Sequence, residues 1–327
     1  MEIAIEHADA LVRAAMMRVG YDAAEAKIIA DHVMGCELRG VSFGGLSRAL
    51  SLIERTRLSP RRPTVVERDT PISAVIDGRD QCGYLVGYQT MRLALDKAAA
   101  GGIGAVGAYN TWYTGMYAHY LEIAANEGLV AMVMGSSAPR VAPHGGRAGG
   151  FGTNPIGFAF PTEEQPIILD IATSVVPIAE LVLAQRTSRD IAPDIAFDTA
   201  GEATTDPAAA LAGAIRVWGG HKGSGLGVVV QLMGMLMGGG AMPADYRDCG
   251  FFFMALQPGL FTDAAAFRRN AADYANALRA TRPVDPDAPV RMPFDRSAAT
   301  RRAILERGMI EVPGGIVSAL KRVCDEG

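Results

Sequence analysis

Hydrophobic residues recur at helical spacing near the start of the chain. The apolar positions of one predicted helix share a single face, and these are Ile28, Ile29, Val33 and Met34. Asp22 and Glu25 precede them with the spacing of a capping box. The pattern predicts a helix that begins at Asp22 and ends near Gly40, preceded by another amphipathic helix at the N-terminus.

Short β-prone runs alternate with helical patterns through the middle of the chain. The predicted strands are residues 74–76, 103–109, 129–134, 156–160, 167–169 and 251–256. The predicted helices are residues 89–100, 117–126 and 222–237, and the tail from residue 264 is mostly helical. Residues 57–69 and 186–207 are polar and contain proline, which favours surface loops. The pattern indicates a mixed α/β architecture.

Composition and charge narrow the function classes. The 327 residues are 49% hydrophobic and 20% charged, as in an ordinary soluble globular protein. A net charge of -4, without a basic run interleaved with aromatics, argues against nucleic acid as a partner. No segment has the length or uninterrupted apolarity of a membrane span, and the N-terminus lacks a signal-peptide pattern. We therefore expect a cytoplasmic protein.

Four scattered cysteines bear on metal binding and redox compartment. Cys36, Cys82, Cys249 and Cys324 form no CxxC pair and have no histidine at zinc-ligand spacing. The spacing predicts neither a disulfide framework nor a metal site, which suits a reducing compartment.

Two motifs match a pattern in the wrong structural context. Gly102, Gly104 and Gly107 satisfy GxGxxG, but a predicted helix precedes them and a strand contains them, the reverse of a dinucleotide fingerprint. We interpret them as a helix C-cap that leads into a strand. Ser42 lies in a GxSxG sequence, the nucleophile elbow of α/β-hydrolases, yet no strand feeds the turn. A serine hydrolase that uses Ser42 is therefore only the second alternative function.

A glycine-rich turn before an apolar helix carries candidate phosphate-binding groups. His221, Lys222 and Gly223 stand at the predicted start of the helix over residues 222–237. Backbone N–H groups at a helix start, together with a lysine ammonium, form a natural phosphate site. A plain glycine-rich turn with a solvated lysine is an equally good interpretation of the spacing.

Several segments together resemble the malate/L-lactate dehydrogenase type-2 family. They are Arg39 to Val41 with Gly45 and Arg48, Gly102 to Asn110, Gly152 to Ile156, Leu169 to Ser174, Thr205 to Pro207, Gly219 to Leu226, Phe251 to Ala255, and Arg291 to Arg296. The resemblance implies a non-Rossmann fold with a mainly antiparallel sheet and a helical domain built from both termini. It implies a helical domain at residues 1–100 and 261–327, a nucleotide-binding domain at 101–260, and a homodimer.

The resemblance also implies a set of site residues for NAD or NADP. Carried over position by position, the residues on or near the nicotinamide cofactor are Gly44, Arg48, Thr153, Asn154, Asp170, Ala172, Thr173, Ser174, His221, Lys222, Gly223, Pro293 and Arg296. Arg48 would approach either the phosphates or a substrate carboxylate.

The chain departs from the family pattern where the catalytic groups are expected. Phe43 and Gly44 stand in place of the family's Ser-His, so the usual proton donor is missing, and Tyr113 stands where another histidine is expected. We expect Gly44 to leave room for a bulkier substrate. Tyr113, His119 and His144 are the candidate replacement acids. For the acidic member of the family's relay, the nearest residues are Glu180 and Asp190.

The missing proton donor affects which substrates we expect. A positioned acid contributes about 10²–10⁴-fold to carbonyl reduction, whereas a protonated imine already carries the charge that attracts hydride. The sequence therefore predicts an NAD(P)-dependent oxidoreductase that acts on a small C=N or C=O substrate, such as a cyclic imine or a 2-oxo/2-hydroxy acid. The first alternative is a non-redox step on a biosynthetic intermediate.

Overall fold

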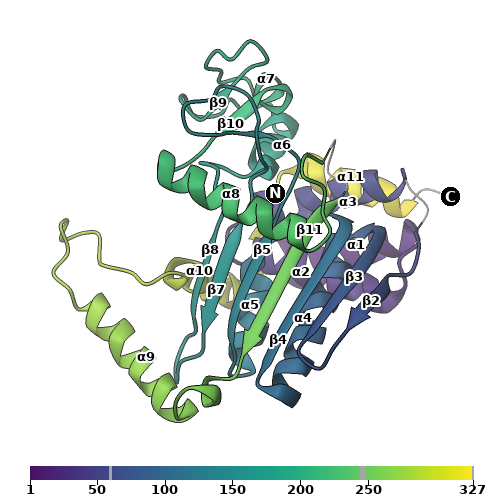
Figure 1. Ribbon diagram of the computed structural model, residues 1–327. Coiled ribbons are helices and arrows are strands. Elements are labelled where there is room, and N and C mark those ends of the chain that lie inside the picture. Colours follow the sequence, from purple (N-terminus) through teal and green to yellow (C-terminus); the bar gives the residue numbers. More distant parts are fainter. Residues whose placement is uncertain (59–60, 244–247, 326–327) are drawn as a thin grey trace.

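A seven-stranded sheet forms the centre of the molecule (Figure 1). The computed structural model describes residues 1–58, 61–243 and 248–325. The strands are β1 (Glu2–Ala4), β2 (Val65–Asp69), β3 (Ser73–Cys82), β4 (Ile103–Trp112), β5 (Val130–Gly135), β6 (Val141–Ala142), β7 (Ile156–Phe160), β8 (Ile167–Ile171), β9 (Ala196–Phe197), β10 (Ala214–Arg216), β11 (Cys249–Leu256) and β12 (Met309–Glu311).

The helices surround this sheet and extend to both ends of the chain. They are α1 (Ile5–Arg18), α2 (Ala23–Glu37), α3 (Leu46–Thr56), α4 (Gly83–Gly101), α5 (Tyr117–Asn126), α6 (Ile178–Arg186), α7 (Pro207–Ala212), α8 (His221–Leu236), α9 (Ala264–Arg279), α10 (Asp295–Arg307) and α11 (Gly314–Asp325). Two short 3₁₀ turns, η1 (Ser42–Gly44) and η2 (Pro258–Leu260), complete the described elements. No helix in the described part of the chain is long and apolar enough to cross a membrane.

The sheet order is β2-β3-β4-β11-β5-β7-β8. Only β3 and β4 pair in parallel, and every other neighbouring pair in this sheet is antiparallel. Helices α4 and α5 cover one face and share a core with its strands, while α8 covers the other face (Figure 1). The mixed fold with a mainly antiparallel sheet is confirmed.

Both ends of the chain meet in a separate helical layer. Helices α1, α2, α3 and α11 bury one apolar cluster together, and β1 pairs with β12. Strands β2 and β3 lie before residue 100 in the sequence yet belong to the central sheet. The domain ranges inferred from the sequence remain a prediction.

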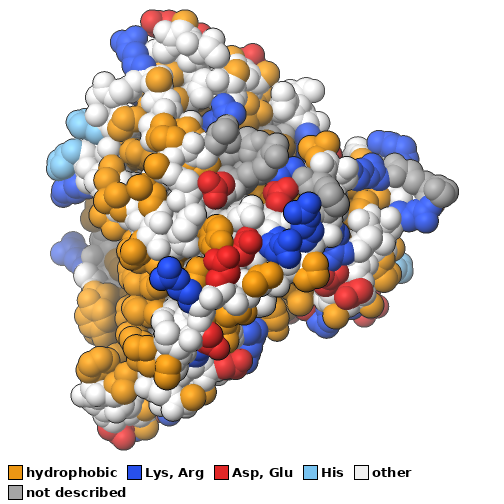
Figure 2. Space-filling view, turned by 45° about the vertical axis from the view of Figure 1, so that its right-hand side comes forward, with side chains coloured by type: hydrophobic (Ala, Val, Ile, Leu, Met, Phe, Trp, Pro, Cys, Tyr) orange, Lys and Arg blue, Asp and Glu red, His pale blue; other side chains and the backbone are white. Residues whose placement is uncertain are grey.

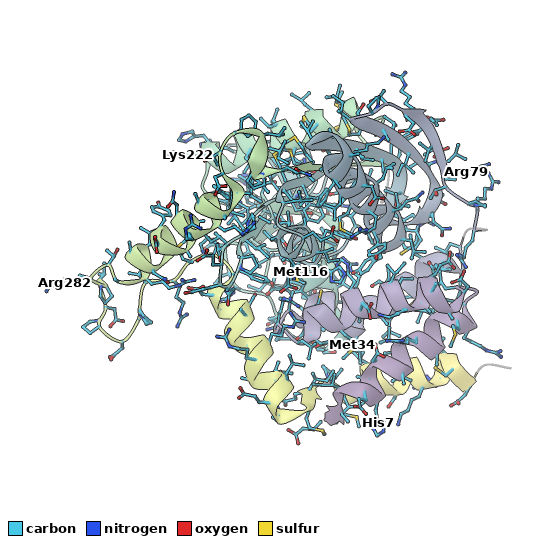
Figure 3. All side chains as sticks on the ribbon, turned by 90° about the horizontal axis from the view of Figure 1, so that it is seen from below. His7, Met34, Arg79, Met116, Lys222 and Arg282 are labelled. Atoms are coloured by element: carbon cyan, nitrogen blue, oxygen red, sulfur yellow. The ribbon has the colours of Figure 1, made fainter. Side chains whose placement is uncertain are left out.

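A small three-stranded sheet, β6-β10-β9, packs with α6 and α7 around a third apolar cluster. Helix α9 and the segment after it extend away from the body, and Arg282 marks the tip of this arm in Figure 3.

Several elements appear where the hydrophobic pattern predicts them. Helix α5 and strand β7 have the predicted bounds, and Asp22 forms the predicted capping box with Glu25. Gly102 adopts the left-handed conformation (φ 82°) that ends α4 before β4, which confirms the interpretation of the glycine motif.

Other elements differ from the prediction for identifiable reasons. Strand β2 lies in residues 57–69, predicted as a loop, and all five of its residues are exposed, so no apolar alternation marked it. Helix α4 begins at Gly83 rather than at residue 89, because its first turns are buried and lack an amphipathic pattern. Helices α3 and α6 were not predicted.

Candidate active site

A cavity of 1010 Å³ opens at one edge of the central sheet. Its walls come from residues where β4, β5 and β8 end and where β7 and β11 begin, so five strands deliver side chains to one place. The turn before α3 and the segment before α10 close it from the helical side. The volume lies at the upper end of the range for ligand pockets, about 300–1,000 Å³.

The structure brings together part of the predicted site. The predicted residues that line the cavity are Gly44, Arg48, Tyr113, Thr153, Asp170, Ala172, Ser174, Pro293 and Arg296. The predicted residues that are not among the lining residues are His119, His144, Asn154, Thr173, His221, Lys222 and Gly223. Sequence reasoning missed Trp218 and Cys249, which also line it, and Arg291 of the resembling segment lines it as well.

Three arginines give the cavity a cationic wall. Arg48, Arg291 and Arg296 line it, and none of them forms an ion pair with a described carboxylate. The Arg48 guanidinium lies over the Tyr113 ring, 4.4 Å from its centroid, a cation–π contact that orients it. Guanidinium groups without a protein counterion are suited to anions such as carboxylates and phosphates.

Backbone strain accompanies this wall. Tyr113 has φ 53° and Phe294 has φ 79°, and both residues line the cavity. The left-handed conformation costs a bulky residue roughly 1–3 kcal/mol, and such strain clusters at binding and active sites. The observation supports a functional role for the cavity.

Asp170 is the one carboxyl residue among the described residues that line the cavity. Its Oδ2 accepts a hydrogen bond of 2.8 Å from the N–H of Ala118, near the start of α5. Met116, which precedes α5, provides no side-chain cap, so Asp170 supplies one from β8. Burial raises the pKa of Asp170 to about 6, although the N–H groups of Ala118 and Tyr117 oppose this rise.

Two histidines, the buried His32 and the partly buried His119, lie behind the cavity wall. His32 Nε2 accepts a hydrogen bond of 2.8 Å from the N–H of Met116, and its ring centroid is 4.4 Å from that of His119. Burial lowers the pKa of both imidazoles, to about 4 for His119. His119 therefore does not reach the cavity as a replacement acid.

The exposed histidines are elsewhere. His144 and His221 face each other at the start of α8, with ring centroids 6.2 Å apart, and Lys222 beside them is exposed. Figure 3 shows Lys222 at the α8 end of the molecule and Met116 near its centre. Within the described residues, therefore, no imidazole lines the cavity.

Three of the remaining predicted residues shape the wall from behind. The buried Asn154 accepts a hydrogen bond from the Ser137 N–H and donates to the Gly227 carbonyl and Gln231. The hydroxyl of buried Thr173 donates to the Thr153 carbonyl. A Cβ on Gly223 would lie 1.9 Å from the Trp218 carbonyl oxygen, so only glycine fits there.

The room predicted at Gly44 is not open on the side from which its side chain would project. Cys36, from α2, fills that space. The acidic candidates Glu180 and Asp190 do not line the cavity either. Ser42 is exposed in a 3₁₀ turn that follows α2 rather than a strand, so the nucleophile elbow of a hydrolase is missing. No metal-binding cluster of histidine, cysteine or carboxylate side chains occurs in residues 1–58, 61–243 and 248–325.

Comparisons with known proteins agree with this architecture. The family model described as malate/L-lactate dehydrogenase matches residues 3–321. Malate/(S)-sulfolactate dehydrogenase of Methanothermus fervidus is 29% identical, over 100% of this chain and 98% of that protein. Delta(1)-pyrroline-2-carboxylate reductase of Pseudomonas fluorescens is 29% identical, over 98% of this chain and 97% of the relative.

A solved structure shares the fold over almost the full length. A dehydrogenase from Sinorhizobium meliloti superposes with a TM-score of 0.90 at 30% identity, covering 99% of this chain and 98% of the other. The chain belongs to the malate/L-lactate dehydrogenase family and is an oxidoreductase.

Proposed function

We propose that the protein catalyses NAD(P)-dependent hydride transfer to or from a small substrate that carries a carboxylate beside a C=N or C=O carbon. The observation that carries the proposal is the cavity itself. Three arginines that form no ion pair with a described carboxylate line it, and no imidazole of the described residues does. Two relatives are named for a hydroxy acid and for a cyclic imine acid, and both substrates carry such a carboxylate.

The residues present fit a nicotinamide dinucleotide. The cavity is large enough for a cofactor and a small acid, and its wall offers hydroxyl groups from Ser136, Ser137, Thr153 and Ser174 besides the guanidinium groups. Arg291 and Arg296 would meet the phosphates, and Trp218 offers an apolar surface. When bound, the nicotinamide would supply or accept the hydride.

Arg48 orients the substrate in this proposal. Its guanidinium is positioned by the Tyr113 ring and can hold a carboxylate through two parallel hydrogen bonds. A bound carboxylate fixes the adjacent carbon, and such positioning lowers the barrier for transfer. Of the three predicted replacement acids, Tyr113 alone lines the cavity, and its role as proton donor stays a prediction.

The missing imidazole favours imine substrates. A ketone develops alkoxide charge as hydride arrives, whereas a protonated imine loses charge in the same step. A cavity wall without imidazole therefore suits C=N reduction better than C=O reduction. We expect cyclic 2-imino acids to be reduced faster than 2-oxo acids.

The homodimer belongs to the same proposal. Helix α8 presents an exposed apolar face, with Leu232 56% and Leu236 71% exposed, and apolar side chains gather along the left side of the molecule in Figure 2. Soluble proteins rarely leave such a helix face uncovered. We infer that a second copy of the chain covers it.

A substrate panel tests the proposed activity. Purified protein is incubated with NADH or NADPH and a series of cyclic 2-imino acids and 2-oxo acids, and cofactor oxidation is followed together with product mass. A product heavier than its substrate by two hydrogens supports hydride transfer. Turnover without a mass change would favour the non-redox alternative, and absence of both binding and turnover of either cofactor would overturn the proposal.

A further inference from the structure

We infer that Asp170 is the proton donor when a C=O substrate is reduced, in place of the histidine that the family pattern places at position 44. The inference rests on the proposed function, because it assigns a group to the reaction in that cavity. Asp170 is the one carboxyl residue among the described lining residues, and no imidazole accompanies it.

The position of Asp170 places its carboxyl on the Gly44 side of the cavity. Its Oδ2 is anchored to the N–H of Ala118, beside Met116 at the start of α5. Met116 Sδ lies 3.9 Å from Cys36 Sγ, and Cys36 fills the space next to Gly44. Burial is the main cause of the raised pKa of the Cys36 thiol, and the nearby Asp170 carboxyl adds to this rise. Asp170 thus borders the part of the cavity next to Gly44, where the family pattern places a histidine.

The surroundings of Asp170 favour its neutral form. The titratable groups that interact with it are the Tyr117 phenol of α5 and the Cys36 thiol of α2, and both have raised pKa values and are uncharged at neutral pH. Arg48, Arg291 and Arg296 line the same cavity but form no ion pair with it. Burial raises the pKa of Asp170 to about 6. Filling the cavity would exclude more water and raise this pKa further.

One oxygen of the carboxyl remains for the reaction. Oδ2 is committed to Ala118, and an Asp170 that is protonated on its other oxygen can donate to a substrate. In reduction, a bound dihydronicotinamide would supply the hydride that the substrate carbon accepts and would itself be oxidised. The π electrons of the C=O bond move to the oxygen, and this oxygen takes the proton as the Asp170 O–H bond breaks. Solvent then restores the proton to the carboxylate.

The alternative donors are less suitable. Tyr84 and Tyr117 are fully buried, with phenol pKa values that burial raises above the usual range. The Tyr113 ring face is covered by Arg48. A donor is most effective when its pKa is near the working pH, which favours a carboxyl raised to about 6 over a phenol.

The experiment measures kcat/KM against pH in both directions for the wild type, for Asp170→Asn and for Tyr113→Phe, which removes the hydroxyl of the competing candidate donor. For the wild type we expect reduction of a 2-oxo acid to be fastest below about pH 6 and to fall above it, with oxidation rising over the same range. Asparagine keeps an acceptor for Ala118 but cannot donate as an acid. In Asp170→Asn, kcat/KM for reduction should fall about 10²-fold or more. The decrease of kcat/KM above about pH 6, the pH limb of the wild type, should also disappear.

Five outcomes test the role of Asp170 and the proposed function. An Asp170→Asn protein with the wild-type rate and pH limb overturns the role of Asp170, and so does a Tyr113→Phe protein that has lost the limb. Asp170→Glu keeps an acid, so a measurable pH limb in this variant supports the role even if Asp170→Asn does not fold, and its loss in a folded Asp170→Glu protein contradicts it. A wild type that neither binds nor oxidises NADH or NADPH removes the proposed function as well.

Discussion

The sulfur of Cys36 lies in close contact with Gly44, because a Cβ built on Gly44 would come 2.9 Å from Sγ. Real Cβ atoms essentially never come so close to a neighbour. The two positions are therefore coupled, and restoring a histidine at Gly44 requires a smaller residue at Cys36.

We expect Gly44→His alone to destabilise the protein by about 1–3 kcal/mol, the usual cost of overpacking. Cys36→Ala should recover part of this loss when combined with Gly44→His, and the double variant should reduce 2-oxo acids faster than the wild type. Thermal unfolding of both single variants and the double variant gives the coupling energy. A Gly44→His protein as stable as the wild type would show that the two positions are independent.

Arg48 should determine affinity for the substrate carboxylate. Arg48→Leu removes the guanidinium that lies over Tyr113, and we expect kcat/KM for acid substrates to fall about 10–10²-fold or more, since a charged hydrogen bond contributes about 1.5–3 kcal/mol. Arg189→Leu, at an exposed position outside the cavity, is the control. Equal losses in the two variants would exclude a specific role for Arg48.

Glu37 should make stability decrease at higher pH. Burial raises its pKa to about 7, although its Oε1 accepts the Leu46 N–H at 2.7 Å. Because the folded pKa lies above the unfolded value of 4.5, its stabilising contribution is full below pH 4.5 and is lost as the pH rises through 7. The resulting loss in the free energy of unfolding has an upper bound of about 3 kcal/mol.

Glu37→Gln keeps an acceptor for Leu46 and removes the ionisable group. The melting temperature of Glu37→Gln minus that of the wild type, both measured by circular dichroism, should increase as the pH is raised from 5 to 8. A difference that stays constant over this range would contradict a raised pKa at Glu37.

The pair of His32 and His119 should make the fold sensitive to acid. The pKa values of His32 and His119 are lowered by burial, so their stabilising contribution is present above the unfolded value of 6.5 and is lost as the pH falls toward 4. His119→Phe should flatten the fall in melting temperature between pH 6.5 and 4.5. His7→Gln, at an exposed position of α1, should leave it unchanged.

The apolar face of α8 should hold two copies of the chain together. Leu232→Glu combined with Leu236→Glu introduces charge at this face and should shift the protein from dimer to monomer in light scattering after size exclusion. Met17→Glu replaces an exposed apolar residue on α1 and should leave the dimer intact. A monomeric wild type would contradict the inferred dimer.

Periodicity by itself determined the elements whose cause is local. Helix α5, strand β7 and the Asp22 capping box follow from side-chain spacing and from capping chemistry between residues three apart. The glycine pattern also predicted, without the fold, that Gly102 ends a helix rather than opening a dinucleotide fingerprint, and the structure confirms it. Strand β2 was not predicted, because its residues are all exposed and show no alternation of apolar and polar side chains.

Only the tertiary structure decided which candidates share a cavity. Tyr113 and His119 are six residues apart, yet one lines the cavity and the other lies behind it, because α5 turns its buried face toward His32. Asp170 was predicted only as a cofactor residue, since its burial and its bond to Ala118 arise where β8 meets α5. Proton affinity depends on such long-range burial, which side-chain spacing along the chain does not encode.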